Sequence, residues 1–363
     1  MSRICFIANL FPSKRDPSFG SFVGKHYEQL NEQGHNIVSK VVIDYRSSGF
    51  RKLILYMRFI FQGVLAVNKR NYDYIYFHYL TYSTICILPY LLLRKPKYVV
   101  NIHGDDLVGS TLVHKVMGCT SSLVLRHSEG VIVPSQYFKV ILLKKYPWYC
   151  EKKVIISPSG GVDFEVFRST RCPDEHQFIL GYVSRIDEGK GWSELLEAIA
   201  LIKKEQPNLL ENFHLNMYGA GAEVEQLKTK LSLLDIGNLV TYFGALKPNQ
   251  LAAKYSEMNA FIFPTHRESF GLVAVEALAC STPVLASNIK PVNEIVIDGV
   301  NGLLFEKQNK HSMAEKIITL LTMNKIDYEY LVKNARESVQ NYNAELVAKQ
   351  LSENLEKLLK TGN

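Results

Sequence analysis

Residues 263–276 read FPTHRESFGLVAVE, and this stretch decides the predicted fold because it joins an apolar strand to a helix. Its turn contains Gly271, which permits close backbone approach. Ligands of open parallel sheets bind beyond the carboxyl ends of the strands, so a site is expected at such a turn. Free backbone N–H groups at the start of the following helix suit a diphosphate. The stretch therefore predicts an anion site in an α/β sheet.

Two carboxylates belong to the same stretch. Glu268 comes just before the free amides, and Glu276 lies eight residues later. That spacing is about two helical turns at 3.6 residues per turn, so both side chains can face one cleft. A carboxylate accepts two hydrogen bonds and matches the vicinal hydroxyls of a sugar or ribose. Taken singly, each has a plainer interpretation, as an N-cap acid for Glu268 and a solvated helix residue for Glu276.

The rest of the chain alternates short β-rich runs with helical patterns. A first series of strands is predicted at residues 3–8, 37–43, 74–77, 98–102, 130–133 and 154–156, and a second at 178–183, 214–218, 239–243, 260–263, 284–286 and 303–305. Helices are predicted between them at residues 22–33, 53–67, 113–126, 137–145, 193–204, 223–234, 249–257 and 272–279. Apolar strands separated by helices indicate parallel sheets covered on both faces. Two series predict two doubly wound domains.

The polar segment 167–176, FRSTRCPDEH, is typical of a domain boundary. We place an N-terminal domain at 1–168 and a C-terminal domain at 169–343. The tail forms an amphipathic pattern with no strand after it, so residues 344–363 are predicted to return to the first domain as a helix.

A second strand-to-helix turn, GYVSRIDEGKG at 181–191, carries Arg185 and Lys190. Two cations at a strand end can neutralise the charge that builds on a departing diphosphate. The alternative is an exposed basic loop.

In the first half, Gly20 lies in PSFGSFV before a helix, and His103 ends a strand in NIHGDD. Gly20 either brings the backbone close to a phosphate or merely permits the turn. His103 either faces the cleft and binds a sugar hydroxyl or is a hydrogen-bonded structural histidine. Asp105 and Asp106 do not form the DxD pattern of metal-dependent sugar transferases, so we predict no metal and no cofactor.

Composition excludes several classes of protein. The 363 residues fit two domains, and the six cysteines form no CxxC pair, which suits a reducing compartment. No signal peptide and no transmembrane segment are predicted, because the apolar runs are too short. The net charge of +7 is moderate, and no basic run in a known module predicts nucleic-acid binding.

Together these motifs resemble family 4 of the retaining glycosyltransferases, which has the GT-B architecture. The match is collinear over nearly the whole chain. Its most specific part is the E-x7-E motif formed by Glu268 and Glu276, and SRIDEGKG supports it. The runs SGGVDFEVF, PTHRESFG, TPVLAS and DGVNGLLF follow in the family's order, and FPSKRDPSFGSFV is similar to the bacterial surface-polysaccharide branch. The chain departs from the pattern at Ser281, where glycine is common, and at 289–294, which lacks a glycine pair.

The resemblance implies two Rossmann-like domains facing each other across a cleft, the first binding acceptor and the second the nucleotide-sugar. It implies that Glu276 binds the ribose, that Glu268 and His103 contact the sugar, and that the reaction retains anomeric configuration without a metal. Arg185 and Lys190 would hold the diphosphate, which Gly20 would approach from the first domain. The remaining donor contacts would come from the amides of Ser269, Phe270, Gly271 and Leu272.

The expected activity is transfer of a hexose or N-acetylhexosamine from a UDP-sugar to a lipid-linked oligosaccharide, in O-antigen, capsule or lipopolysaccharide synthesis. Residues 51–70, RKLILYMRFIFQGVLAVNKR, either lie at an anionic membrane or pack on the sheet with basic ends in water. The expected location is cytoplasmic, with peripheral contact at the inner membrane face. Alternatives are a hydrolase, epimerase or phosphorylase of the same fold, and a non-catalytic nucleotide-sugar-binding subunit.

Overall fold

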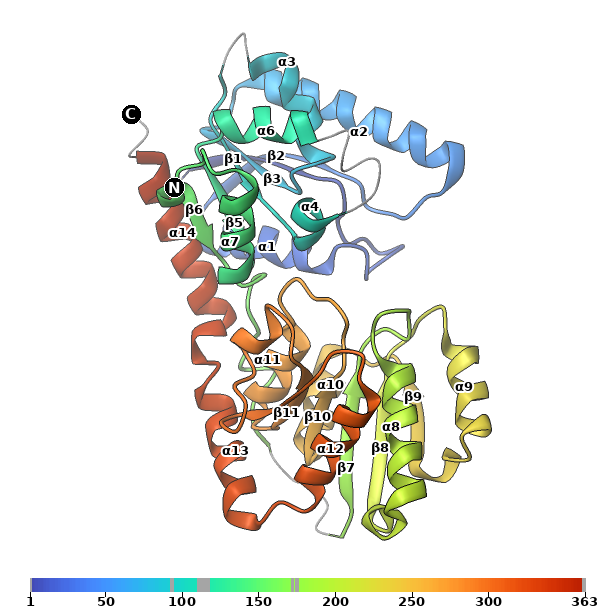
Figure 1. The fold of residues 1–363 in the computed structure, drawn as a ribbon. Coiled ribbons are helices and arrows are strands. Elements are labelled where there is room, and N and C mark those ends of the chain that lie inside the picture. Colours follow the sequence, from blue (N-terminus) through green and yellow to red (C-terminus); the bar gives the residue numbers. More distant parts are fainter. Residues whose placement is uncertain (1, 92–94, 110–117, 171–172, 174–175, 361–363) are drawn as a thin grey trace. The chain divides into compact units, whose positions relative to one another are not determined.

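The computed structural model describes residues 2–91, 95–109, 118–170, 173 and 176–360. The chain forms two compact units, one of Met1–Gly161 with Ala344–Asn363 and the other of Val162–Asn343. Each is organised around its own parallel sheet (Figure 1).

The boundary between the units falls before the polar segment in which the sequence placed it. Phe164 and Phe167 are buried in a core of the second unit. The Val162 N–H donates to the Tyr342 carbonyl at 2.8 Å, which ties the start of this unit to its end. Several residues of the predicted boundary segment lie outside the described part of the chain.

The sheet of the first unit has the strand order β2-β1-β3-β4-β5-β6. Its strands are β1 (Arg3–Ala8), β2 (Asn36–Val42), β3 (Tyr74–His78), β4 (Tyr98–Asn101), β5 (Gly130–Val133) and β6 (Val154–Ile156). The described helices of this unit are α1 (Ser21–Glu32), α2 (Gly49–Lys69), α3 (Leu88–Leu91), α4 (Gly104–Val108), α6 (Gly118–His127), α7 (Gln136–Lys145) and α14 (Ala344–Lys360), with 3-10 turns η1 (Ser83–Ile87) and η2 (Glu151–Lys153). Strands β3, β4 and β5 are buried throughout, as expected for a parallel sheet covered on both faces. Of the helix predicted at 113–126, residues 113–117 lie outside the described residues.

The C-terminal helix α14 packs on the first unit, which confirms the prediction from its amphipathic pattern. Its Leu351 and Leu355 are buried with Phe6 and Tyr76 of the sheet. The Ser352 hydroxyl lies 2.9 Å from Nε2 of His35. Residues 361–363 of the predicted helix are not among those described.

The sheet of the second unit has the order β12-β11-β10-β7-β8-β9. Its strands are β7 (Phe178–Val183), β8 (Phe213–Tyr218), β9 (Val240–Gly244), β10 (Ala260–Phe263), β11 (Val284–Ser287) and β12 (Gly302–Phe305). Its helices are α8 (Trp192–Glu205), α9 (Val224–Leu233), α10 (Pro248–Glu257), α11 (Leu272–Ala279), α12 (Lys310–Leu321) and α13 (Lys325–Glu337), with 3-10 turns η3 (Pro207–Leu210), η4 (Gly237–Leu239), η5 (Val292–Glu294) and η6 (Gln340–Tyr342). Helices α12 and α13 are not among those predicted from the sequence.

These topologies confirm two doubly wound α/β units and show where each can bind a ligand. In the first unit the strand order reverses between β1 and β3, and in the second between β7 and β10. Open α/β sheets bind ligands in the crevice at that reversal, beyond the carboxyl ends of the strands. No helix in the described ranges is long and apolar enough to cross a membrane.

Candidate functional site

The candidate site of the second unit is built from the loops after β7 and β10. These strands are parallel neighbours, with Gly181 opposite Phe261 and Tyr182 opposite Ile262. The loops that leave them, residues 184–191 and 264–271, therefore start side by side at the point of strand reversal. Each loop leads directly into a helix, α8 or α11.

An ion pair between Lys190 and Glu268 joins these two loops. The Lys190 Nζ lies 3.1 Å from Oε2 of Glu268, and the side chains are 17% and 21% exposed. The sequence singled out both residues without predicting their contact. At this burial solvent screens the pair less than it would on an open surface, so each charge fixes the other's position. An anion entering the crevice would meet an ammonium group that is already oriented.

Backbone hydrogen bonds hold the Lys190 loop in place. The buried Tyr182 hydroxyl donates to the carbonyl of Arg185 at 3.3 Å and to that of Lys190 at 3.2 Å. Burial raises the pKa of Tyr182, so its hydroxyl remains a donor. The His266 N–H donates to the Gly189 carbonyl at 2.9 Å, which links the two loops a second time.

Gly191 is required where the two loops meet. It caps α8 with φ of 71°, and a Cβ there would lie 2.0 Å from the Pro264 carbonyl oxygen. We expect Gly191→Ala to lower the free energy of unfolding by about 3 kcal/mol, because left-handed backbone strain adds to a backbone clash. Urea unfolding of the purified protein measures this. The control is Gly237→Ala, since a Cβ at Gly237 meets nothing within 4 Å. Equal stability of the two variants would contradict the prediction.

Arg185 lies in the same loop but is committed differently. Its side chain is 72% exposed, and its guanidinium pairs with Asp187 of its own loop at 2.8 Å. Asp187 also accepts a hydrogen bond from the Ala222 N–H at 2.8 Å. Arg185 therefore fits the alternative interpretation from the sequence, an exposed basic loop. A diphosphate that bound Arg185 would have to share its guanidinium with Asp187.

The start of α11 offers backbone donors next to Glu268. Gly271 is the N-cap residue, with φ of 105° and no side-chain capping hydrogen bond. The interpretation of Glu268 as an N-cap acid is therefore wrong. Ser269 and Leu272 are half-buried, and the buried Phe270 packs edge-on against Tyr342 at 5.3 Å. The amides that the sequence assigned to the donor thus lie at the positive end of a helix dipole.

Glu276 projects from the second turn of α11 towards α10. The Tyr255 hydroxyl of α10 donates to its Oε2 at 3.2 Å. Burial raises the pKa of Tyr255 well above its ordinary value, so this tyrosine stays a donor. Because Glu276 is half-buried and hydrogen-bonded, it is not merely a solvated helix residue.

Ser281, where the resembled family often has glycine, follows the end of α11 with φ of 62°. This left-handed conformation favours glycine, which explains the family pattern and shows that the serine carries some backbone strain.

In the first unit, Gly20 caps α1 at the end of the loop that follows β1. Its φ is 74°, and a Cβ there would lie 2.4 Å from Cδ1 of Leu10 and 2.9 Å from the Leu10 carbonyl carbon. Packing against Leu10 is thus sufficient to require glycine. The predicted approach of Gly20 to a diphosphate stays a prediction.

His103 lies in a cluster of buried histidines that sequence reasoning missed. Its Nε2 is 3.1 Å from Nδ1 of His78, and the two rings stack. The His26 ring lies 5.2 Å from that of His78. Burial lowers the pKa of His103 to about 3 and that of His26 to about 4, and it places the pKa of His78 well below its ordinary value. A signal was present, since His78 ends β3 beside the strand reversal.

Asp106 holds the backbone on both sides of this cluster. Its carboxylate accepts hydrogen bonds from the N–H groups of Leu80, Thr81 and His103 at 3.1 to 3.3 Å. Burial nevertheless raises the pKa of Asp106 to about 6. The side chain of Asp105 lies outside what the structure describes. Among the described side chains, no group of three or more His, Cys, Asp or Glu residues could hold a metal ion. The metal-independence stays a prediction.

Residues 163–338, which contain the candidate site of the second unit, match the family model of glycosyl transferases group 1. The second unit of the chain thus matches the group 1 glycosyltransferases. The matched region includes both loops, the Lys190–Glu268 pair and α11.

Comparisons with known proteins agree with this match. The capsular polysaccharide biosynthesis glycosyltransferase CapM of Staphylococcus aureus is 30% identical over 199 residues, which is 50% of this chain and 49% of CapM. The chain thus matches about half the length of CapM. The uncharacterized glycosyltransferase MJ1178 of Methanocaldococcus jannaschii is 26% identical over 93% of this chain and 90% of its own. The crystal structure of Anabaena Alr3699/HepE in complex with UDP has a TM-score of 0.75 at 17% identity, covering 98% of this chain and 100% of that chain. The fold is that of the GT-B glycosyltransferases.

Proposed function

We propose that this group 1 glycosyltransferase moves a hexose or N-acetylhexosamine from a UDP-sugar to a hydroxyl of a lipid-linked oligosaccharide. The transfer retains anomeric configuration and needs no metal. The observation that carries the proposal is the half-buried Lys190–Glu268 pair, which lies at the strand reversal beside the uncapped start of α11. A cation, a carboxylate and free amides are the groups that a sugar diphosphate requires.

In this proposal the donor diphosphate accepts hydrogen bonds from Lys190 and from the amides at the start of α11, with Arg185 at the solvent side. Glu276 binds the ribose hydroxyls, and Tyr255 holds its carboxylate in place. Glu268 contacts the sugar, and Lys190 orients it. For Gly20 and His103 of the first unit, contact with the diphosphate and the sugar stays a prediction from the resemblance.

The bond between the anomeric carbon and the phosphate oxygen breaks, and the acceptor oxygen bonds to that carbon on the same face. The acceptor proton passes to the departing phosphate. Preorganised donors at Lys190 and the α11 amides stabilise the negative charge that develops there, which is the largest common source of enzymatic rate enhancement.

Two similarities support the donor and the pathway. HepE, which shares the fold, crystallised with UDP. CapM is named for capsular polysaccharide biosynthesis, which supports an acceptor in surface-polysaccharide synthesis, as for capsule, O-antigen or lipopolysaccharide. Such an acceptor places the enzyme in the cytoplasm, at the inner face of the membrane.

Thermal unfolding with a panel of UDP-, GDP- and ADP-sugars tests the donor. We expect only UDP-sugars to raise the melting temperature, because binding at 100 times Kd adds about 2.7 kcal/mol of stability. UDP alone gives part of the shift, since it carries the diphosphate and ribose. The absence of a shift with every UDP-sugar would overturn the donor assignment.

An inverted anomeric centre in the product, seen by proton NMR, would contradict retention. Release of the sugar to water alone would favour a hydrolase.

A further inference from the structure

Helix α2 presents a second apolar face to solvent. Its buried face contributes Phe59 and Val67 to the core of the first unit. On the other side, six large apolar side chains are between 48% and 74% exposed: Phe50, Leu53, Ile54, Met57, Phe61 and Leu65. At about 100° per residue these six fall within one stripe about 120° wide. Figure 1 shows α2 on the outside of this unit. Contiguous exposed apolar surface of this kind marks an interaction site.

One edge of this apolar stripe is basic. At about 100° per residue, Arg51, Arg58 and Lys69 fall within about 20° of one another, so they form a line along the helix next to the stripe. The helix GFRKLILYMRFIFQGVLAVNK contains no acidic residue. An apolar face with a cationic border and no acids is the pattern of a helix that lies in a membrane interface.

A hollow of about 480 Å³ opens beside the basic edge. It is lined by four arginines, Arg15, Arg46, Arg51 and Arg58, together with Tyr45, Ser47, Ser48, Ile54 and Leu55. Arginine is the side chain best suited to phosphate, because its planar guanidinium offers paired donors. The hollow therefore has the chemistry of a phosphate site.

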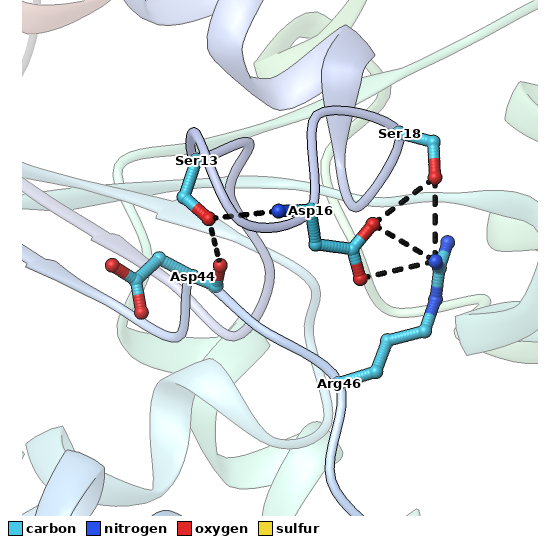
Figure 2. Close-up of polar contacts among 5 residues, drawn as sticks. All are labelled: Ser13, Asp16, Ser18, Asp44 and Arg46. Carbon is cyan, nitrogen blue, oxygen red and sulfur yellow. Dashed lines mark hydrogen bonds and ion pairs between the residues drawn. The ribbon is translucent and has the colours of Figure 1, made fainter.

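Two of these arginines are held by the protein itself. Figure 2 shows Arg46 donating to both carboxylate oxygens of Asp16, at 2.9 and 3.0 Å, and to the Ser18 hydroxyl at 3.2 Å. The Asp16 N–H donates to Ser13 Oγ, which in turn donates to the Asp44 carbonyl, so the backbone that carries this carboxylate is held in place. Arg15 lies over the Tyr45 ring at 4.9 Å.

The other two arginines have no such partner. Across the described ranges, no acidic side chain lies within ion-pairing distance of Arg51 or Arg58. Both are exposed and border the apolar stripe. Their charge is thus available to an external anion that approaches together with an apolar phase.

We propose that the outer face of α2 docks on an anionic lipid bilayer, with the apolar stripe among the acyl chains and lipid phosphates in the arginine-lined hollow. Charge complementarity selects this occupant over a second copy of the chain, since α2 of a second copy has no acidic residue to pair with the basic edge. The proposal deepens the proposed function, because it names the surface through which a lipid-linked acceptor would be reached.

Co-sedimentation of the full chain with vesicles tests this without any turnover. We expect binding to vesicles of equal parts phosphatidylglycerol and phosphatidylcholine, and at least about tenfold weaker binding to phosphatidylcholine alone. Added salt should weaken the binding, because it screens exposed charges. Leu53→Gln with Phe61→Gln should abolish binding, and Arg51→Glu with Arg58→Glu should reduce it by at least about tenfold.

The matched controls lie in the second unit. Leu233→Gln with Ile326→Gln removes two apolar side chains that are more exposed than Leu53 and Phe61, and Lys325→Glu reverses an exposed charge. These should bind vesicles like the wild type. Wild-type binding by the two α2 variants would overturn the proposal. So would a dimer that Phe61→Gln dissociates in the absence of vesicle binding, since the stripe would then be a self-association surface. UDP-sugar thermal shifts, measured in parallel, report the proposed function separately.

Discussion

Replacing Lys190 with Met is expected to lower kcat by about 10²- to 10³-fold while leaving the protein folded. The side chain lies in the loop after β7, paired with Glu268 at 3.1 Å, where negative charge would build on the leaving diphosphate in the proposed function. Removal of one preorganised donor of this kind commonly costs that much in rate. The cost in stability should stay near 1 kcal/mol, because the pair is still partly solvated. Steady-state kinetics and urea unfolding of the same preparation measure both quantities.

Glu268→Gln should lower kcat by a similar factor, because glutamine keeps the shape of the side chain and removes its charge. The double variant should be little slower than either single one, because the two residues act as a unit.

A matched control exists in the same unit. Lys230 pairs with Glu197 at a similar burial, between α8 and α9. Lys230→Met therefore removes a comparable ion pair from outside the crevice and should leave kcat unchanged. If Lys190→Met and Lys230→Met had the same kcat, the assignment of the site would fail, whatever their stabilities.

The local parts of this site could be predicted from the sequence. The turn at 263–276 joins β10 to α11, and α11 spans Leu272–Ala279, the range expected from the apolar pattern. Such elements are specified by neighbouring residues, through hydrophobic periodicity and a glycine turn. The two-unit α/β fold follows from the same alternation of strands and helices.

The contacts could not be predicted in the same way. Lys190 and Glu268 meet because β7 and β10 are neighbours in the sheet, and strand order is a tertiary property. His78 and His26 escaped notice because nothing near them in sequence is unusual, although the fold stacks His78 on His103 and sets the His26 ring edge-on to His78.

Helix α2 shows the same limit. Its basic ends are visible in the sequence, but packing decides which of its apolar faces is buried and which remains exposed. Sequence alone therefore left membrane contact and packing on the sheet as alternatives, whereas the structure shows one apolar face buried on the sheet and a second one exposed.

Acid is expected to destabilise the first unit steeply, because its buried histidines must charge on unfolding. The unfolded pKa of a histidine is near 6.5, whereas the folded pKa is about 4 for His26 and about 3 for His103, and the folded pKa of His78 is also strongly lowered. Above pH 6.5 neither state takes protons. Below it only the unfolded state does, so each histidine removes about 1.4 kcal/mol of stability per pH unit until its folded pKa is reached.

Asp106 acts with the opposite sign. Its folded pKa of about 6 exceeds the unfolded value of 3.8, so the folded state takes a proton first as pH falls from 6 towards 4. That gain in stability offsets the loss that one of the three histidines causes over the same pH range. The net loss between pH 7 and pH 5 is on the order of 4 kcal/mol, a large part of the stability of an ordinary domain.

Fluorescence can isolate this effect, because Trp148 lies in the first unit and Trp192 in the second. In a Trp192→Phe background, urea midpoints at pH 7, 6 and 5 follow the first unit alone. His78→Gln should reduce the loss of first-unit stability by about 1.4 kcal/mol per pH unit, because glutamine cannot take up a proton. His311→Gln, on the exposed surface of the second unit, should leave that loss unchanged. A first-unit midpoint that is the same at pH 5 as at pH 7 would show that these imidazoles are solvated, because only hydrated rings could charge in the folded state without cost.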